Sequence, residues 1–316
     1  MHNKLVIICG PTAVGKSTLA VWLAKKCNGE VVSADSRQVY KGLDVGTGKI
    51  TKKEMAGIPH HLLDVASPRG QFTVAKFKQL AEKAVKDIRG RGKLPIVVGG
   101  TGLYIDTLLG RFTIPEVPPD LALRKKLEKK SAEALFAELL KLDPRRAETI
   151  DRHNPRRLIR ALEIARALGA VPPREHFDIL GLPAIQLQAG NVGMAGSEYR
   201  VLWVGLSLPK EELAKCITVR LFARMGEQGM IQEVRRLHKN GLSWKRLEAL
   251  GLEYRYCALY LQKKLGKDEM VERLQKEICR YAKRQMTWFK RNKDIKWFLP
   301  NEATRVTSLV RTFLRN

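Results

Sequence analysis

The chain has 316 residues, of which 44% are hydrophobic and 28% charged, and its formal net charge of +26 corresponds to a pI near 10.1. This composition is ordinary for a soluble globular protein with one large or two modest domains, and no apolar run is long enough to cross a bilayer. The positive charge favours a polyanionic partner, chiefly nucleic acid or an anionic membrane surface, over a merely soluble basic surface.

The cysteines and the N-terminus bear on the compartment. The N-terminus lacks the features of a signal peptide, and the five cysteines form no C-x-x-C pair and no metal-like spacing. They are typical of reduced, mostly buried thiols. We therefore expect a cytoplasmic protein without a zinc site.

The first element predicted along the chain is a strand, Leu5–Cys9, followed by a glycine-bounded loop and an amphipathic helix over Thr18–Cys27. The loop has the phosphate-binding pattern G-x-x-x-x-G-K-S, formed by Gly10, Pro11, Thr12, Ala13, Val14, Gly15, Lys16 and Ser17. Its backbone N–H groups and Lys16 would bind phosphate oxygens, and the Ser17 hydroxyl would ligate Mg²⁺. The pattern predicts a di- or triphosphate site, with ATP as the first candidate ligand.

Two later strand ends are predicted to lie near this loop. Glu30–Asp35 is a short strand that enters a polar turn, and Leu94–Val98 is a buried strand that opens into Gly99-Gly100-Thr101-Gly102. Ligands of doubly wound sheets bind at the carboxyl ends of parallel strands, so Asp35 and Thr101 are candidates to face the bound ligand. From position alone Asp35 could equally be a cap or turn residue, and the glycine-rich segment could be a packing turn.

Between these two strands we expect a brief strand and a helix. The strand lies within Ile58–Val65 and contains His60 and His61, which we interpret as hydrogen-bonded structural groups and not as metal ligands. Apolar residues at helical spacing from Phe77 to Ile88 predict a helix that ends at Gly90.

The pattern changes at the proline-rich run Ile114–Asp120, after which only helices are predicted as far as Gly169. In the helix starting at Asn154, an apolar stripe runs along one side. Three arginines fall largely off that stripe: Arg156, Arg157 and Arg160. This basic face is either a solvated surface or an RNA contact. The glycine-rich stretch Leu182–Glu198 then predicts a mobile connection.

The α/β pattern returns with a strand at Val201–Leu206. The next helix carries Arg220 and Arg224 at i, i+4 spacing, and their planar guanidinium groups could close over bound phosphates or lie on a solvated face. The last long helix, about Asp268 to Arg291, interleaves basic and aromatic side chains, as suits an RNA-facing helix that also packs against a core.

Seven motifs in a fixed order give the chain a specific resemblance. They are Gly10–Ser17, Asp35–Tyr40, Asp44–Thr47, Pro59–Asp64, Gly99–Tyr104, Asn154–Glu163 and Tyr281–Phe289. Together they resemble the motifs of the tRNA dimethylallyltransferases, also called isopentenyl-tRNA transferases, over Gly10 to about Trp297. The resemblance implies an α/β fold in which a P-loop kinase-like core with a parallel sheet is interrupted by a helical insertion domain.

This resemblance and the proline-marked boundary predict three segments. Residues 1–114 would form the first part of the core, 115–195 the helical insertion that binds tRNA, and 196–316 the second part of the core with basic C-terminal helices. The chain ends without the zinc-finger extension of eukaryotic members, which favours the bacterial type. We expect a monomer.

The family moves a dimethylallyl group from dimethylallyl diphosphate to the exocyclic N6 amine of the adenine just 3′ of the tRNA anticodon. The resemblance implies that the phosphate loop and Mg²⁺ hold diphosphate as a leaving group, because preorganised donors and cations stabilise its developing charge. Asp35 would accept the proton of the amine as general base, and Thr101 would hold the reacting groups in line. Arg220 and Arg224 would cover the diphosphate.

The target base must leave its stack in the anticodon stem-loop to react. The resemblance assigns contacts with tRNA to Thr101, to the turn Asp35, Ser36, Arg37 and Gln38, and to the helix segment Arg156, Arg157, Leu158, Ile159 and Arg160. The segment Leu250–Arg255 is a looser version of the family's Gly-Tyr-basic turn, so Arg255 is a less secure contact. The stretch Gly181–Ser197 receives no role.

Three other functions share the phosphate loop: an ATP-dependent kinase, an RNA-binding switch that hydrolyses a nucleotide, and an enzyme that prenylates free adenine nucleotides. A small substrate would not need the helical insertion or the basic surface. A kinase would not explain why the Asp35 and Thr101 motifs occur together with the tRNA-contact segment.

Overall fold

The computed structural model describes residues 3–111, 115–171, 191–194, 197–226 and 229–316. The chain divides into two compact units, one comprising Met1–Gly110 with Ala184–Asn316 and the other Arg111–Pro183. From the sequence these boundaries are expected after residues 114 and 195. Most of the predicted connection Leu182–Glu198 lies outside the described residues.

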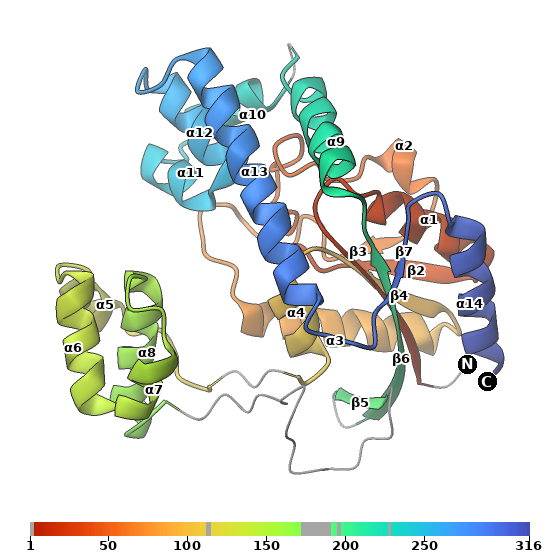
Figure 1. Cartoon of the computed structure of the whole chain (residues 1–316), viewed down its shortest axis with the longest axis horizontal. Helices are drawn as coiled ribbons and strands as arrows, with labels where there is room; N and C mark the ends of the chain where they lie inside the picture. Colours follow the sequence, from red (N-terminus) through yellow and green to blue (C-terminus); the bar gives the residue numbers. More distant parts are fainter. Residues whose placement is uncertain (1–2, 112–114, 172–190, 195–196, 227–228) are drawn as a thin grey trace. The chain divides into compact units, whose positions relative to one another are not determined.

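Within the described residues, a seven-stranded sheet forms the centre of the larger unit, in the order β3-β2-β4-β1-β6-β5 with β7 also paired to β6 (Figure 1). The strands are β1 (Lys4–Cys9), β2 (Gly29–Ser33), β3 (His60–His61), β4 (Leu94–Val98), β5 (Asn191–Met194), β6 (Ser197–Leu206) and β7 (Lys296–Phe298). Among the described residues the strands pair in parallel, except for β5, which runs antiparallel to β6. The predicted parallel α/β core is confirmed, whereas β5 and β7 are strands that the sequence did not indicate.

The sheet is covered on both faces, which explains why β1 and β4 read as uninterrupted apolar runs. Along β1, Leu5 and Ile7 face one hydrophobic core, while Val6 and Ile8 face a second core. Helices α1 (Lys16–Lys26) and α14 (Ala303–Arg315) cover the second core, and α3 (Val74–Gly90) and α4 (Gly102–Leu108) pack on the first.

The remaining helices of this unit follow β6, apart from the short α2 (Lys52–Met55). They are α9 (Lys210–Ala223), α10 (Met230–Lys239), α11 (Trp244–Leu250), α12 (Leu252–Leu261) and α13 (Lys267–Phe289). The long helix α13 runs from the α10–α12 group to α4 (Figure 1), where the Trp288 indole donates a hydrogen bond to Asp106 at 2.8 Å. In the part of the chain that the structure describes, no helix combines the length and hydropathy that a bilayer-crossing segment requires.

The described residues of the smaller unit form helices, as predicted. It contains α5 (Leu121–Leu127), α6 (Ala132–Leu142), α7 (Pro144–Thr149) and α8 (Pro155–Leu168). Side chains of Asp120, Asp143 and Asn154 accept hydrogen bonds from backbone N–H groups in the first turns of α5, α7 and α8. These caps fix the helix starts because they satisfy N–H groups that have no partner within the helix.

Candidate active site

Three loops meet at one edge of the sheet, where β1, β2 and β4 end. The Ala34 N–H donates to the Val98 carbonyl at 2.8 Å, and the Gly99 N–H donates to the Ile8 carbonyl at 3.1 Å. The Thr101 N–H donates to the Ala34 carbonyl at 3.3 Å. These bonds continue the strand pairing into the loops, so the phosphate loop, the Asp35 turn and the glycine-rich turn lie next to one another.

The phosphate loop has the strand–loop–helix context that its sequence pattern requires. At Gly10 the backbone has φ = 141°, and a Cβ there would overlap the Leu206 carbonyl oxygen of β6. Only glycine therefore lets the loop leave β1 so close to β6. The Lys16 ammonium folds over the loop and donates a hydrogen bond to the Pro11 carbonyl at 2.6 Å. Among the loop's side chains, Val14 packs into the hydrophobic core next to α1.

The charge on Lys16 is sensitive to its surroundings. Burial and the nearby Arg220 lower the pKa of the Lys16 ammonium to about 8, while Asp35 opposes this shift.

Ser17 is exposed in the first turn of α1. Among the described residues, no cluster of three or more His, Cys, Asp or Glu side chains could hold a metal by itself. A hydroxyl beside a phosphate loop fits Mg²⁺ of the kind that is held mainly by substrate phosphates and water.

Asp35 forms the turn that follows β2. Its Oδ1 accepts hydrogen bonds from the backbone N–H groups of Arg37 at 2.8 Å and Gln38 at 3.2 Å. The adjacent Ser36 N–H donates to Thr101 Oγ1 at 3.2 Å, which joins this turn to the glycine-rich turn. Asp35 is thus a turn residue, and it also lies close enough to Lys16 to act on its charge.

Tyr281, to which the sequence assigned no role of its own, joins this group. Burial and the Asp35 carboxylate raise the pKa of its phenol, and a hydrogen bond with Thr101 partly offsets the shift. The structure therefore brings together Asp35, Thr101 and a residue of α13 that is about 180 positions further along the chain than Thr101.

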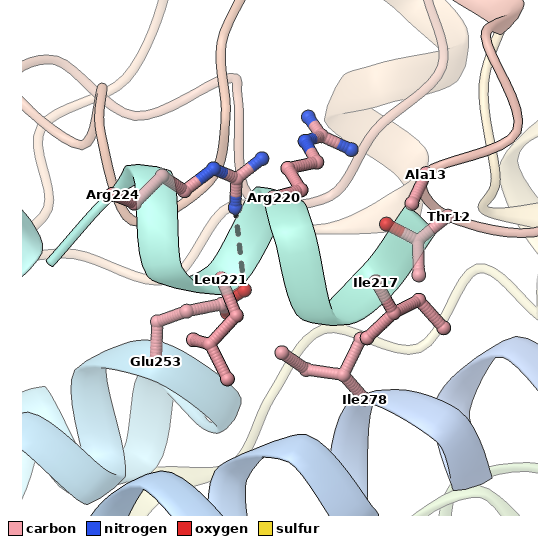
Figure 2. Close-up of a pocket in the computed structure, with 8 residues that line it drawn as sticks. All are labelled: Thr12, Ala13, Ile217, Arg220, Leu221, Arg224, Glu253 and Ile278. Atoms are coloured by element: carbon pink, nitrogen blue, oxygen red, sulfur yellow. Dashed lines mark ion pairs between the residues drawn. The ribbon is translucent and has the colours of Figure 1, made fainter. Parts of the chain in front are cut away.

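Arg220 and Arg224 do not form a solvated face. Arg220 donates to the Gly48 carbonyl at 3.1 Å, and Arg224 donates to the Gly46 carbonyl at 3.3 Å. The pKa of Arg224 is lowered to about 10 by burial and then by the neighbouring Arg220. Both arginines line a narrow pocket together with Thr12 of the phosphate loop (Figure 2). The structure thus brings the arginine pair and the phosphate loop to one pocket.

The loop that receives these arginines is held by Glu233 of α10. The Glu233 carboxylate accepts hydrogen bonds from the N–H groups of Asp44 at 2.9 Å, Val45 at 2.7 Å and Gly46 at 3.0 Å. It also accepts one from the Tyr254 hydroxyl at 2.7 Å. Glu233 thus fixes the backbone of the Asp44–Thr47 motif, and the Gly46 carbonyl of this motif accepts the hydrogen bond from Arg224. Sequence reasoning missed Glu233. The feature that could have indicated it is an acidic residue among the otherwise apolar buried positions of α10.

The segment of α8 that the resemblance predicts to contact tRNA has side chains in different environments. Arg156 and Arg157 are exposed, whereas the side chains of Leu158 and Ile159 lie in the hydrophobic core of the smaller unit. Arg160 pairs with the buried Glu163 and donates to the Val117 carbonyl at 2.9 Å. Of the five side chains, Arg156 and Arg157 are exposed, Arg160 is partly exposed, and Leu158 and Ile159 are buried.

The paired histidines are hydrogen-bonded, as predicted. His61 Nε2 lies 2.7 Å from a carboxylate oxygen of Glu30, and His60 Nδ1 lies 2.8 Å from the Ile58 carbonyl oxygen. All five cysteines have free thiols: Cys9, Cys27 and Cys257 are buried, and Cys216 and Cys279 are partly exposed.

The sequence is similar to known proteins of one family. A sequence model of the family described as IPP transferase matches residues 38–292. The tRNA dimethylallyltransferase of Anoxybacillus flavithermus is 42% identical over 299 residues, which cover 94% of this chain and 91% of that protein. The tRNA dimethylallyltransferase 2 of Treponema denticola is 43% identical over 291 residues, with 92% of each protein covered.

Two solved structures extend the likeness to the fold. The full-length tRNA isopentenylpyrophosphate transferase of Bacillus halodurans matches with a TM-score of 0.70 and 35% identity, covering 99% of this chain and 97% of that chain. A eukaryotic dimethylallyltransferase, described as acting on tRNA, matches with a TM-score of 0.81 and 27% identity. That match covers 99% of this chain and 80% of that chain.

Proposed function

Because the chain belongs to the IPP transferase family, we propose that it transfers a dimethylallyl group from dimethylallyl diphosphate to tRNA. The acceptor is the N6 amine of the adenine that follows the anticodon on its 3′ side, and diphosphate is released. The enzyme acts as a cytoplasmic monomer. The observation that supports this proposal best is that the phosphate loop, the arginine pair and the Asp35–Thr101 turns meet at one edge of the sheet.

The leaving group would be stabilised by fixed donors. Breaking the allylic C–O bond places negative charge on the diphosphate, and preorganised N–H groups and cations lower the energy of that charge. Lys16 belongs to the phosphate loop, and Arg220 and Arg224 line a pocket with Thr12; all three donate hydrogen bonds to backbone carbonyls. Mg²⁺, held by Ser17 and phosphate oxygens, would supply further positive charge to the leaving group.

The acceptor amine would lose its proton to Asp35. A carboxylate is a suitable base here because the amine becomes acidic as its bond to carbon forms. Both backbone hydrogen bonds to Asp35 use Oδ1, so we assign the proton to Oδ2. Thr101 and Tyr281 lie beside this carboxylate and would orient Asp35 relative to the donor carbon.

Recognition of the tRNA would rest on charge. A chain with a net charge of +26 gains affinity from displaced counterions along an RNA backbone. We assign phosphate contacts to the exposed Arg156 and Arg157 and base contacts to the turn that runs from Asp35 to Gln38.

A donor-preference assay tests the proposal. The purified protein is incubated with Mg²⁺ and total tRNA, together with either labelled dimethylallyl diphosphate or ATP labelled in its γ-phosphate. We expect label in tRNA only from the prenyl donor, and only when adenine follows the anticodon. Transfer from ATP would instead establish a kinase, and labelling of free adenine nucleotides in preference to tRNA would establish the smaller acceptor.

A further inference from the structure

Glu253 is an acidic side chain placed among groups to which we assign diphosphate binding. It lies in the first turn of α12, and its Oε1 is 3.6 Å from Arg224 Nη1. The two side chains are only 13% and 15% exposed. Glu253 lines the same pocket as Thr12 and Ala13 of the phosphate loop, and Figure 2 shows its ion pair with Arg224.

The pocket is too small to separate these groups. Its volume is about 10 Å³, and Glu253 and both arginines line it. An anion bound to the guanidinium of Arg224 would therefore have the Glu253 carboxylate as a close neighbour.

Other carboxylates of this region are engaged by different groups. Glu233 accepts three backbone N–H groups and the Tyr254 hydroxyl, and Asp35 accepts two backbone N–H groups. Glu54 accepts hydrogen bonds from the backbone N–H and hydroxyl of Thr51. Glu253 differs, because the ion pair that it forms is with one of the arginines of the proposed diphosphate site.

The Glu253 carboxylate stabilises the positive charges of the buried arginine pair. Burial lowers the pKa values of Arg220 and Arg224, and the two cations repel each other, whereas Glu253 favours the charged form of both. Diphosphate would stabilise the arginines in the same way. Two anions that share one guanidinium repel each other, so each weakens the binding of the other.

We propose that Glu253 is a positioning residue that holds Arg224 and lowers the affinity of the arginine pair for diphosphate, so that the product is released. This inference rests on the proposed function, because it takes the arginine pair beside the phosphate loop to bind the leaving group. It makes Glu253 a determinant of product release in addition to the residues that bind the donor.

The test measures binding of inorganic diphosphate in the presence of Mg²⁺ by titration calorimetry. We expect Glu253→Gln to bind diphosphate on the order of 10-fold more tightly than the unaltered protein, the factor that corresponds to about 1.4 kcal/mol of lost repulsion. Inhibition of the transfer reaction by added diphosphate should strengthen by the same factor. Glu253→Met, also neutral and of similar volume, provides a second variant if the glutamine variant unfolds.

Three controls separate charge from shape. Glu253→Asp keeps the charge and should bind diphosphate within about twofold of the unaltered protein, since the repulsion persists. Glu212→Gln makes the same change of net charge at an exposed position of α9 and should have no effect. In an Arg224→Gln background the effect of Glu253→Gln should shrink, because the coupling between the two residues is lost.

Two results would overturn the inference. Unchanged or weaker diphosphate binding by both neutral variants, or equal tightening in Glu253→Asp, would show that the carboxylate charge does not set the affinity. A protein that binds no diphosphate before any substitution would refute the proposed function itself, so the two failures are distinguishable.

Discussion

Gln285 of α13 accepts a hydrogen bond from the backbone N–H of Thr12 at 2.8 Å and donates one to the Gly100 carbonyl at 2.9 Å. The side chain is 5% exposed, so a single buried amide joins the phosphate loop to the turn that carries Thr101. These two loops hold the groups that we assign to the donor and to the acceptor. Their separation therefore depends on a residue of α13, far along the chain from both loops.

We expect Gln285→Glu to lower the transfer rate by roughly 10²-fold, because a carboxylate cannot donate to the Gly100 carbonyl and small displacements of reacting groups have effects of this size. The lost hydrogen bond should also reduce the free energy of unfolding by about 1–3 kcal/mol. Single-turnover kinetics and urea unfolding measure the two effects. Gln232→Glu, the same change at an exposed position of α10, is the control, and equal rates for the two variants would contradict the coupling role.

The two roles of Asp35, turn and base, can be separated. Asp35→Asn retains an oxygen for the backbone N–H groups of Arg37 and Gln38 but cannot accept the proton. We expect it to fold normally, to keep most of its affinity for tRNA because the turn is retained, and to transfer the prenyl group about 10²–10⁴-fold more slowly. Asp35→Ala loses both roles and should in addition weaken the turn.

Rapid-quench measurement of the transfer step checks this prediction, with Asp87→Asn on the exposed side of α3 as the matched control. A transfer rate in Asp35→Asn within a factor of three of the control would exclude Asp35 as the base.

Features could be predicted from the sequence where the interacting residues are close together in the chain. The phosphate loop and the caps at Asp120, Asp143 and Asn154 could be predicted because their partners are a few residues away. Gln285 and Glu253 could not, since their contacts join distant parts of the chain. The same limit hid β7, a strand of three residues with no alternating pattern of its own.

Orientation on a helix posed a related problem. Spacing alone placed Arg156, Arg157 and Arg160 on one basic face, yet Arg160 turns to Glu163. Arg124 of α5 binds the same carboxylate, so the buried Glu163 joins two arginines in a cluster that only tertiary packing assembles.

This division of α8 predicts different outcomes for its arginines. Arg156→Ala and Arg157→Ala should weaken tRNA binding without loss of stability, and each should reduce the slope of log affinity against log salt by about 0.7–0.9 if one phosphate contact is lost. Arg160→Ala should destabilise the protein, because Glu163 is buried and would lose a charged partner. Filter binding over a series of salt concentrations and thermal unfolding separate these effects. Unchanged salt slopes in the first two variants would remove α8 from the proposed tRNA surface.

Glu30 allows the stability of the core to be tested away from the active site, because it lies near the amino end of β2. Its carboxylate is 3% exposed and pairs with His61, Arg91 and Lys93 at 2.7–2.9 Å. Burial alone would raise the pKa of Glu30, but the hydrogen bonds from its partners outweigh burial and lower it to about 2 from an ordinary 4.5.

A carboxyl group whose pKa is lower in the folded than in the unfolded state stabilises the fold above its unfolded pKa. For Glu30 this stabilisation is complete above about pH 5 and disappears as the pH falls through 4.5 towards 2. We therefore expect Glu30→Gln to reduce the free energy of unfolding at pH 7 by about 3 kcal/mol. The difference in this free energy between the variant and the unaltered protein should become smaller at acid pH. Urea unfolding between pH 3 and pH 7 measures this difference. The exposed pair of Glu272 and Lys276 provides the control, since Glu272→Gln should leave stability unchanged. A loss of stability in Glu30→Gln that does not vary with pH would show that packing, not charge, accounts for the loss.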